Sequence, residues 1–275
     1  MEKYYPQKDY YSFSVYNYAG KSANPFSKTF RNIQSEYLLF RKNKLLGWLF
    51  CTGYVVPGYY RWLRKVHASY DTSILDVGSG GGELLFRLHR IGFTNLTGVD
   101  PFIEKDIFAD GVKIYKKDIF DVEGMYDFIM INHAFEHMDE PLSVLKKAHK
   151  LLSAGGSLMI RVPVSDAYCW HLYKENWAPL DAPRHLYIHS ARSMKILVDK
   201  AGFTIKDMVH DATAFQFWGS EQYAKDISLI AENSYNKNKS KSIFDKSQIR
   251  KYRRQIAALN KQQMGGDAVF YLHKK

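Results

Sequence analysis

The feature that most constrains the fold of this 275-residue chain is a glycine-rich turn that directly follows a short apolar run. The run is Ile74-Leu75-Asp76-Val77, and the turn reads Gly78-Ser79-Gly80-Gly81-Gly82 before a helical pattern begins. Glycines let the backbone turn sharply and approach a ligand closely, because they carry no Cβ. The amides at the start of the following helix can donate to a carboxylate or a phosphate. The pattern therefore favours a ligand-binding loop over a tight turn that binds nothing.

From Ser73 onward, short apolar runs alternate with helical patterns, which indicates a parallel sheet with crossover helices. The expected strands are residues 74–77, 96–99, 112–115, 126–131, 157–162, 203–209 and 268–273. Helices are expected after the glycine turn, over residues 142–152, where Gly155-Gly156 marks the stop, and over residues 190–202, with Ser190 as N-cap.

Two further regions complete the predicted organisation. Residues 1–70 form an aromatic and basic N-terminal cap, with helices near 33–39 and 59–67. Residues 71–275 form the core, with a helical insert over 211–266 that is too long for a simple loop. In the insert, Tyr223, Ile227 and Ile230 predict one helix, and a second helix follows the cap residue Asp245.

Acidic residues follow the next two expected strands. Asp100 ends the second strand, where a carboxylate can accept both hydroxyls of a ribose. It can also act as a helix N-cap, because Pro101 follows it. A nicotinamide-binding fingerprint would require glycine at the sixth position from Gly78, and Glu83 occupies that position.

The spacing instead resembles the D-x-G-x-G-x-G motif of class I S-adenosylmethionine-dependent methyltransferases. The segment from Asn132 to Met138 resembles the Glu-His segment of ubiquinone-biosynthesis-type methyltransferases, and residues 151–156 are similar to their L-L-x-x-G-G turn. Residues 182–186, followed by 200–203, resemble a subgroup of small-molecule and glycan-pathway methyltransferases.

This resemblance covers residues 73 to about 210 and the last strand. It implies an α/β, Rossmann-like fold with a seven-stranded, mostly parallel sheet whose last strand is antiparallel. It also implies S-adenosylmethionine as cofactor and S-adenosylhomocysteine as product. The residues that would bind the cofactor are Asp76, Gly78, Ser79, Gly80, Gly82, Asp100, Pro101, Asp118, Ile119, Asn132 and His133. By this resemblance, Asp118 would accept from the adenine amino group and Ile119 would pack near the base. The alternative for Asp118 is a turn aspartate that has no ligand.

Methyl transfer to a hydroxyl requires removal of a proton, and a neutral histidine suits that task at neutral pH. His133, His137 and His185 fall at the expected catalytic edge, and we expect His185 to be the general base. His137 is the second candidate, and its alternative is a structural role near the start of a helix. Most aromatic residues of the segment 165–189 are expected to pack a lid onto the core.

Four possible metal ligands lie close together in the chain: Glu136, His137, Asp139 and Glu140. Two of them have a simpler role. Asp139 and Glu140 suit the first turn of the helix that follows them, because the amino end of a helix carries partial positive charge. The sequence therefore predicts no required metal.

The net charge of +11 raises the question of anionic partners such as nucleic acid or a membrane surface. Solvated helix faces explain much of this charge. The N-P-P-Y motif of amino-methylating nucleic acid enzymes is matched only in part by Asn132-His133-Ala134-Phe135, so a nucleic acid substrate is not favoured. A small-molecule or glycan acceptor and O-methylation are expected instead. A non-catalytic protein that binds S-adenosylmethionine is a further alternative.

Residues 45–60 are apolar enough to rest on a membrane surface, although a helical cap over the active site is favoured. The chain begins without the apolar run of a signal peptide, and its two cysteines lie outside any paired-spacing motif. We therefore expect a cytoplasmic enzyme.

Overall fold

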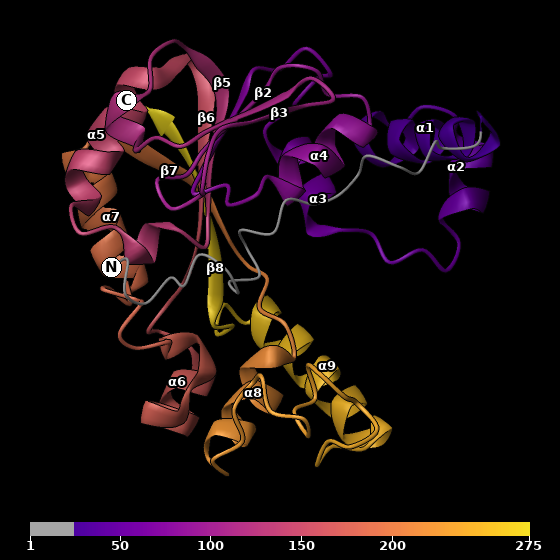
Figure 1. Cartoon of the computed structure of the whole chain (residues 1–275), viewed down its shortest axis with the longest axis vertical. Coiled ribbons are helices and arrows are strands. Elements are labelled where there is room, and N and C mark those ends of the chain that lie inside the picture. The colour runs from indigo at the N-terminus through magenta and orange to yellow at the C-terminus, as the bar shows by residue number, and fades with distance from the viewer. Residues whose placement is uncertain (1–24) are drawn as a thin grey trace. The chain divides into compact units, whose positions relative to one another are not determined.

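The computed structural model describes residues 25–275, so the first 24 residues of the predicted N-terminal cap lie outside the described residues. The described chain alternates helices and strands (Figure 1). The strands are β1 (Ile74–Val77), β2 (Leu96–Val99), β3 (Ile107–Ala109), β4 (Val112–Tyr115), β5 (Tyr126–Asn132), β6 (Leu152–Pro163), β7 (Phe203–His210) and β8 (Asp267–Lys274). The α-helices are α1 (Pro25–Phe40), α2 (Lys44–Cys51), α3 (Gly58–Lys65), α4 (Glu83–Arg90), α5 (Pro141–Leu151), α6 (Tyr168–Tyr173), α7 (Ala191–Lys200), α8 (Phe215–Tyr223) and α9 (Lys246–Lys261). Short 3₁₀ turns include η2 (Ile119–Asp121), η3 (Phe135–His137), η4 (Lys174–Asn176) and η5 (Ala178–Leu180).

The strands form one sheet in the order β3-β4-β2-β1-β5-β6-β8-β7. β1 pairs with β2, and β2 with β4, in parallel, whereas β7 and β8 are antiparallel. The predicted Rossmann-like fold with an antiparallel last strand is therefore confirmed. All four residues of β1 are buried, as expected of a strand inside a parallel sheet, which is covered on both faces.

The sheet has eight strands rather than the predicted seven. The additional strand, β3, pairs antiparallel with β4 through a turn at Asp110-Gly111. Both turn residues have positive φ, 51° and 80°, which suits the Asp-Gly sequence of a tight hairpin. Three residues are too few for a strand period to be recognised, but the Asp-Gly pair was a usable signal.

Two predicted boundaries were wrong. The strand expected at 157–162 begins at Leu152, so that Gly155 and Gly156 lie inside β6 instead of ending α5. The insert helix expected over residues 223–230 is α8, which ends at Tyr223, and Ile230 is 82% exposed.

The sequence pattern did not predict the bounds of helix α8, because the buried face of this helix is largely polar. Gln216, Ser220 and Gln222 are fully buried. The indole N–H of Trp177 donates to Gln216 Oε1 at 2.6 Å, and the amide of Ala178 donates to Ser220 Oγ at 2.9 Å. Hydrogen bonds of this kind remove the cost of burying polar groups, so no apolar period is needed.

The chain divides into two compact units. Residues 131–149 and 160–275 form the C-terminal unit, and the described residues up to 130, together with 150–159, form the N-terminal unit. In the N-terminal unit, α4 packs against β2 and β4, and α1 packs against α2 and α3.

The C-terminal unit has a core of its own, formed where α6, α8 and α9 gather (Figure 1). Trp177 is the largest side chain in it and is 1% exposed, so aromatic residues of the segment 165–189 do pack the helical insert together. The predicted caps are confirmed, because Asp245 accepts from the amide of Gln248 at 2.7 Å and Ser190 from that of Ser193 at 3.0 Å.

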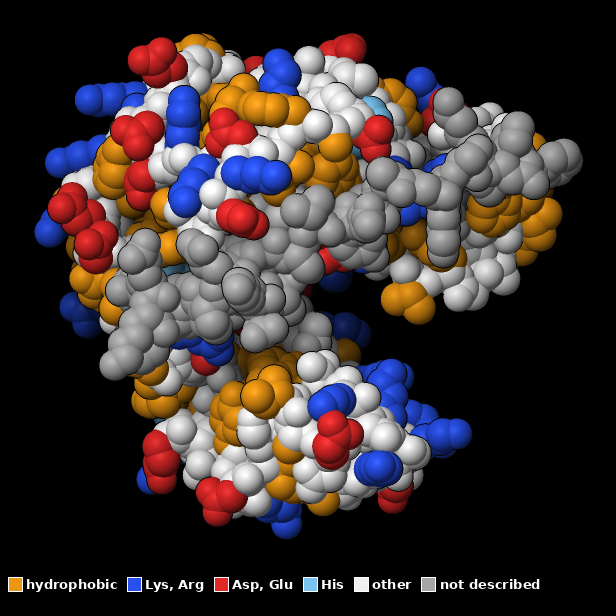
Figure 2. Space-filling model, viewed as in Figure 1, with side chains coloured by type: hydrophobic (Ala, Val, Ile, Leu, Met, Phe, Trp, Pro, Cys, Tyr) orange, Lys and Arg blue, Asp and Glu red, His pale blue; other side chains and the backbone are white. Residues whose placement is uncertain are grey.

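Helix α2 and the turn that follows it carry an unusual number of exposed apolar side chains. These are Leu45, Leu46, Trp48, Leu49, Tyr54, Val55 and Val56. Figure 2 shows apolar side chains gathered over the surface of α1 and α2, on the right of the view. None of the helices in the described part of the chain is both long and apolar enough to span a membrane.

Candidate active site

The glycine turn joins β1 to α4 in the N-terminal unit. Gly78, Gly80 and Gly82 have φ of 76°, 53° and 80°, the left-handed region in which glycine is favoured. The amides of Gly78 and Ser79 donate to the carbonyl of Val99 at 2.8 and 3.2 Å, so the turn is fixed to the end of β2. A Cβ on Gly82 would lie 2.0 Å from Cδ1 of Ile114, so a side chain there would force Ile114 to move.

Asp76 and Asp100 are two buried carboxyl groups beside this turn, 4% and 6% exposed. Burial and the nearby charge of Asp100 raise the pKa of Asp76 to about 7. Among the described residues, no lysine or arginine forms an ion pair with Asp76. A cationic ligand group would therefore stabilise the ionised form of Asp76.

Asp100 makes two hydrogen bonds, one of which is the capping contact predicted for it, and its contact with a ribose stays a prediction. Its Oδ2 accepts from the amide of Gly80 at 2.9 Å, and its Oδ1 accepts from the amide of Phe102 at 2.8 Å. The second bond is the capping contact expected where Pro101 follows. The first bond joins the carboxyl group to the glycine turn, so Asp100 helps to shape that turn.

Asp118 caps the 3₁₀ turn η2, because its Oδ1 accepts from the amide of Phe120 at 3.0 Å. This is the turn role that the sequence offered as the alternative to contact with an adenine. Ile119 is buried next to it, 3% exposed. The adenine contact of both residues stays a prediction.

Asn132 and His133 lie in the C-terminal unit, apart from the other predicted cofactor residues, which lie in the N-terminal unit. Oδ1 of Asn132 is buried and has no hydrogen-bond partner among the described residues. His133 has a positive φ of 51°, and its amide donates to the carbonyl of Arg161 at 2.9 Å. Arg161 is fixed in turn by Asp211, whose Oδ1 accepts from its Nε at 2.8 Å.

Glu136 is the residue of this site that the sequence reasoning missed, having considered it only as a metal ligand. Its side chain is fully buried, and within residues 25–275 its Oε2 has no hydrogen-bond partner. Oε1 lies 3.4 Å from Nδ1 of His133 and 3.8 Å from Nε2 of His185. Burial alone would raise the pKa of Glu136, but the hydrogen bond from His133 and the neighbouring histidines hold it below its usual value.

The two predicted catalytic histidines are brought together with Glu136. The rings of His137 and His185 are 4.7 Å apart. Nδ1 of His185 lies 2.8 Å from the carbonyl of Pro179, and Nδ1 of His137 lies 2.9 Å from that of Arg184. Because a carbonyl only accepts, each Nδ1 must carry the proton of the neutral ring, which leaves Nε2 as the basic atom.

Burial lowers the pKa of His185, and the carboxylates of Glu136 and Asp181 oppose this effect only in part. The ring is therefore neutral at pH 7, with a lone pair on Nε2. Oε1 of Glu136 and Oδ2 of Asp181 both lie 3.8 Å from this atom, where they would stabilise a proton that it accepts.

Glu136, His137 and His185 also have ligand atoms within 4.8 Å of one another, a spacing that could hold a metal ion. Asp139 and Glu140, which the sequence grouped with Glu136 and His137, are not in this cluster. The prediction that no metal is required stays a prediction.

A family described as a methyltransferase domain matches residues 38–207, which is more than half of the chain. A ubiquinone biosynthesis O-methyltransferase from Colwellia psychrerythraea is 32% identical over 99 residues, covering 32% of this chain and 40% of that protein. The EEF1A lysine methyltransferase 2 of Homo sapiens is 45% identical over 40 residues, covering 14% of this chain and 17% of that protein. The chain thus spans less than half of the length of these curated relatives.

Among solved structures, a mycolic acid cyclopropane synthase in complex with SAH superposes with a TM-score of 0.50 and 15% identity. The superposition covers 90% of this chain and 94% of that chain. At this level of identity the likeness shows the fold alone.

Proposed function

The chain belongs to the methyltransferase domain family, a class I family whose methyl donor is S-adenosylmethionine, and on that premise we propose that it methylates a hydroxyl group of a small-molecule or glycan acceptor. The similarity to an O-methyltransferase of ubiquinone biosynthesis supports an oxygen acceptor. The observation that carries the proposal is the neutral, buried His185 with its basic Nε2 beside the carboxylate of Glu136.

The residues of the N-terminal unit suit S-adenosylmethionine. The donor carries an ammonium group and a sulfonium, and either cation would relieve the repulsion between Asp76 and Asp100. The amides at the start of α4 are donors for its carboxylate. When bound, S-adenosylmethionine supplies an electrophilic methyl group and leaves as S-adenosylhomocysteine.

Each predicted cofactor residue keeps a proposed task. Asp76 accepts from the amino group of the donor, and the glycine turn with Ser79 binds its carboxylate. Asp100, next to Pro101, accepts from the ribose hydroxyls, and Asp118 with Ile119 holds the adenine. Asn132 and His133 are proposed to contact the donor as well, and Oδ1 of Asn132, which has no partner among the described residues, supports a ligand contact.

The acceptor hydroxyl loses its proton to Nε2 of His185 as its oxygen forms the bond to the methyl carbon. Pro179 fixes the tautomer of His185 through its carbonyl, and Glu136 stabilises the imidazolium that results. His137, whose ring contacts that of His185, keeps the ring in position and is the second candidate for contact with the acceptor. General base catalysis of this kind contributes about 10²–10⁴-fold to a rate.

The substitution His185→Gln tests this assignment. We expect the rate of S-adenosylhomocysteine formation with a hydroxyl acceptor to fall about 10²–10³-fold, because glutamine cannot accept the proton. The acceptors to be tried are 3,4-dihydroxybenzoate and methyl glucoside. At saturating S-adenosylmethionine, the rate of the unsubstituted chain should rise with pH through a value below 6.5 and then stay level, and the variant should lose this rise.

Two controls accompany this test. Calorimetric binding of S-adenosylhomocysteine should be the same in His185→Gln, and dialysis against EDTA should leave activity intact if no metal is required. A full-length chain that binds neither S-adenosylmethionine nor S-adenosylhomocysteine would contradict the proposal. Methylation of amines in place of hydroxyls would refute the oxygen assignment alone.

A further inference from the structure

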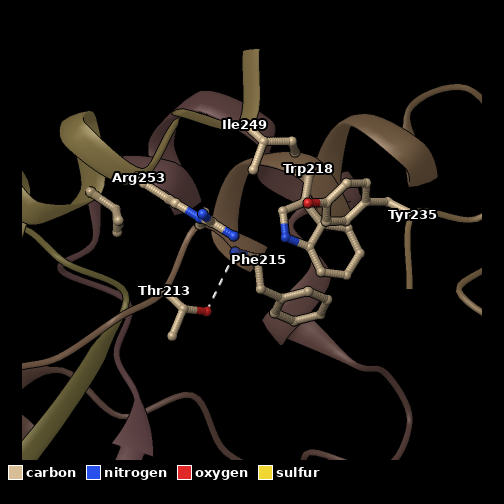
Figure 3. A pocket seen from close by; sticks show the side chains of 8 residues that line it. Thr213, Phe215, Trp218, Tyr235, Ile249 and Arg253 are labelled. Carbon is tan, nitrogen blue, oxygen red and sulfur yellow. Dashed lines mark hydrogen bonds between the residues drawn. The ribbon is translucent and has the colours of Figure 1, made fainter. Parts of the chain in front are cut away.

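A pocket of about 320 Å³ lies in the C-terminal unit, between the chain after β7, helix α8 and helix α9 (Figure 3). It is distinct from the Glu136, His137 and His185 cluster, none of whose residues lines it. Its volume is at the lower end of the range of small-molecule sites, about 300–1,000 Å³. A ligand of one or two rings would fill it.

Three aromatic rings form one side of this pocket. The ring centroids of Phe215 and Trp218 are 4.9 Å apart, and those of Trp218 and Tyr235 are 5.2 Å apart. Ile249 and Ile256 of α9, each 4% exposed, close the apolar side. Walls of this kind favour a planar, apolar group, because aromatic rings pack well against other rings.

Arg253 is the only charged residue among the eight that line the pocket. Figure 3 shows its guanidinium pointing into the space between Ile249 and Phe215. Among the described residues, no aspartate or glutamate forms an ion pair with it, whereas Arg161 and Arg184 in the same unit each pair with an aspartate.

An aromatic pocket by itself could equally hold a cation, which the faces of the rings attract. The guanidinium of Arg253 opposes that reading, because it would repel a second positive charge. A guanidinium instead binds carboxylate and phosphate groups through paired hydrogen bonds. Lys239, whose Nζ lies 5.9 Å from the centroid of the Tyr235 ring, adds positive potential on that side.

We infer that this pocket is a second ligand site, specific for a small anionic molecule that carries a planar ring. The ring lies against Trp218 and Tyr235, and the carboxylate or other acidic group is held by Arg253. The inference does not depend on the methyl donor or on the proton acceptor His185.

Isothermal titration calorimetry on the full chain, without any methyl donor, tests the site with a charged and a neutral ligand of the same shape. We expect 1-naphthoate to bind at least about tenfold more tightly than 1-naphthamide, because only the carboxylate pairs with Arg253. In Arg253→Gln, the affinity for 1-naphthoate should fall to that for 1-naphthamide. Arg254→Gln is the matched control, since Arg254 is the adjacent, exposed arginine of α9 and does not line the pocket.

The inference would be overturned if 1-naphthoate failed to bind or bound no more tightly than 1-naphthamide. It would also be overturned if Arg253→Gln bound 1-naphthoate undiminished, or if Arg254→Gln lost as much affinity as Arg253→Gln. The substitution Trp218→Leu tests the contact with the ligand ring independently of the contact with the ligand carboxylate. This variant should weaken both ligands by a similar factor if the ring lies against Trp218. Arg253 is exposed, so its replacement by glutamine is not expected to unfold α9, and circular dichroism checks this.

Discussion

At the scale of single residues, the proposed chemistry of this chain depends on buried carboxyl groups whose ionisation their neighbours control. Asp76 has a pKa raised to about 7 by burial and by Asp100. Glu136 is equally buried, yet the hydrogen bond from His133 and the adjacent histidines keep its pKa low. Buried carboxyl groups are therefore suited to meet a cation in one unit and to stabilise one in the other.

We predict that S-adenosylhomocysteine binds more tightly as the pH rises from 6 to 8. Because the pKa of Asp76 is raised, this carboxyl group is mostly uncharged below pH 7 and above it gains the negative charge that pairs with an ammonium group. A single group of this pKa changes the affinity about tenfold over that range. Calorimetry at several pH values measures the change, and Asp76→Asn should remove it. A pH-independent affinity in the unsubstituted chain would contradict the role proposed for Asp76.

At the scale of elements, the candidate site depends on turns whose backbone conformation and close packing favour glycine over other residues. The glycine turn after β1 passes so close to β4 that a Cβ on Gly82 would clash with Ile114. Helix α2 is different, because its exposed apolar side chains are not explained by packing within the described chain.

Gly82→Ala should destabilise the fold more than Gly124→Ala does, by about 1–3 kcal/mol. Both glycines have positive φ, 80° and 100°, so both variants bear the cost of a left-handed alanine. Only at Gly82 does the new methyl group meet another atom, since nothing lies within 4 Å of a Cβ at Gly124. Urea denaturation measures the difference. The companion substitution Ile114→Val, which removes the clashing Cδ1, should restore part of the loss.

If α2 and the turn that follows it rest on a membrane surface, as the sequence allows, Val55→Glu in that turn should weaken cosedimentation of the full chain with anionic vesicles. Val55 is 87% exposed, and the exposed Arg41, Lys42 and Lys44 nearby would pair with anionic lipid headgroups. Ile230→Glu is the matched control, because Ile230 is 82% exposed and lies in another part of the chain. Equal binding of both variants, or no binding by the unsubstituted chain, would leave α2 as a helical cap alone.

At the scale of the whole molecule, the chain has 39 lysines and arginines against 28 aspartates and glutamates. This excess of positive charge is the reason to consider a nucleic acid partner. Several of these cations already have local partners. Arg161 pairs with Asp211, Arg184 with Asp181 and Arg87 with Glu83. A high net charge therefore does not by itself define a binding face.

We expect no tight binding of duplex DNA or hairpin RNA at about 150 mM salt, and fluorescence anisotropy with labelled oligonucleotides measures it. Non-specific binders typically show dissociation constants of about 10⁻⁴–10⁻⁶ M under such conditions. An affinity well below the micromolar range, with a steep dependence on salt, would favour a nucleic acid substrate over a small molecule.

The sequence by itself determined the parallel sheet, the glycine turn, and the caps at Ser190 and Asp245, because each depends on residues close together in the chain. It also identified His137 and His185 as candidates, since histidines after strand ends are visible as a pattern. It missed β3, which is too short to show a period, and misplaced α8, whose buried face consists of hydrogen-bonded glutamine and serine.

Only the tertiary structure decided which atoms meet. Contacts between residues far apart in sequence have no local signal, so the 3.8 Å approach of His185 to Glu136 could not be read from the chain. For the same reason the carbonyl of Pro179 that fixes the His185 tautomer, and the aromatic pocket that receives Arg253, appear only once the insert helices are packed. The strand–glycine turn–helix pattern predicted the family that the match over residues 38–207 shows, and packing between distant segments brings together the residues on which the proposed chemistry depends.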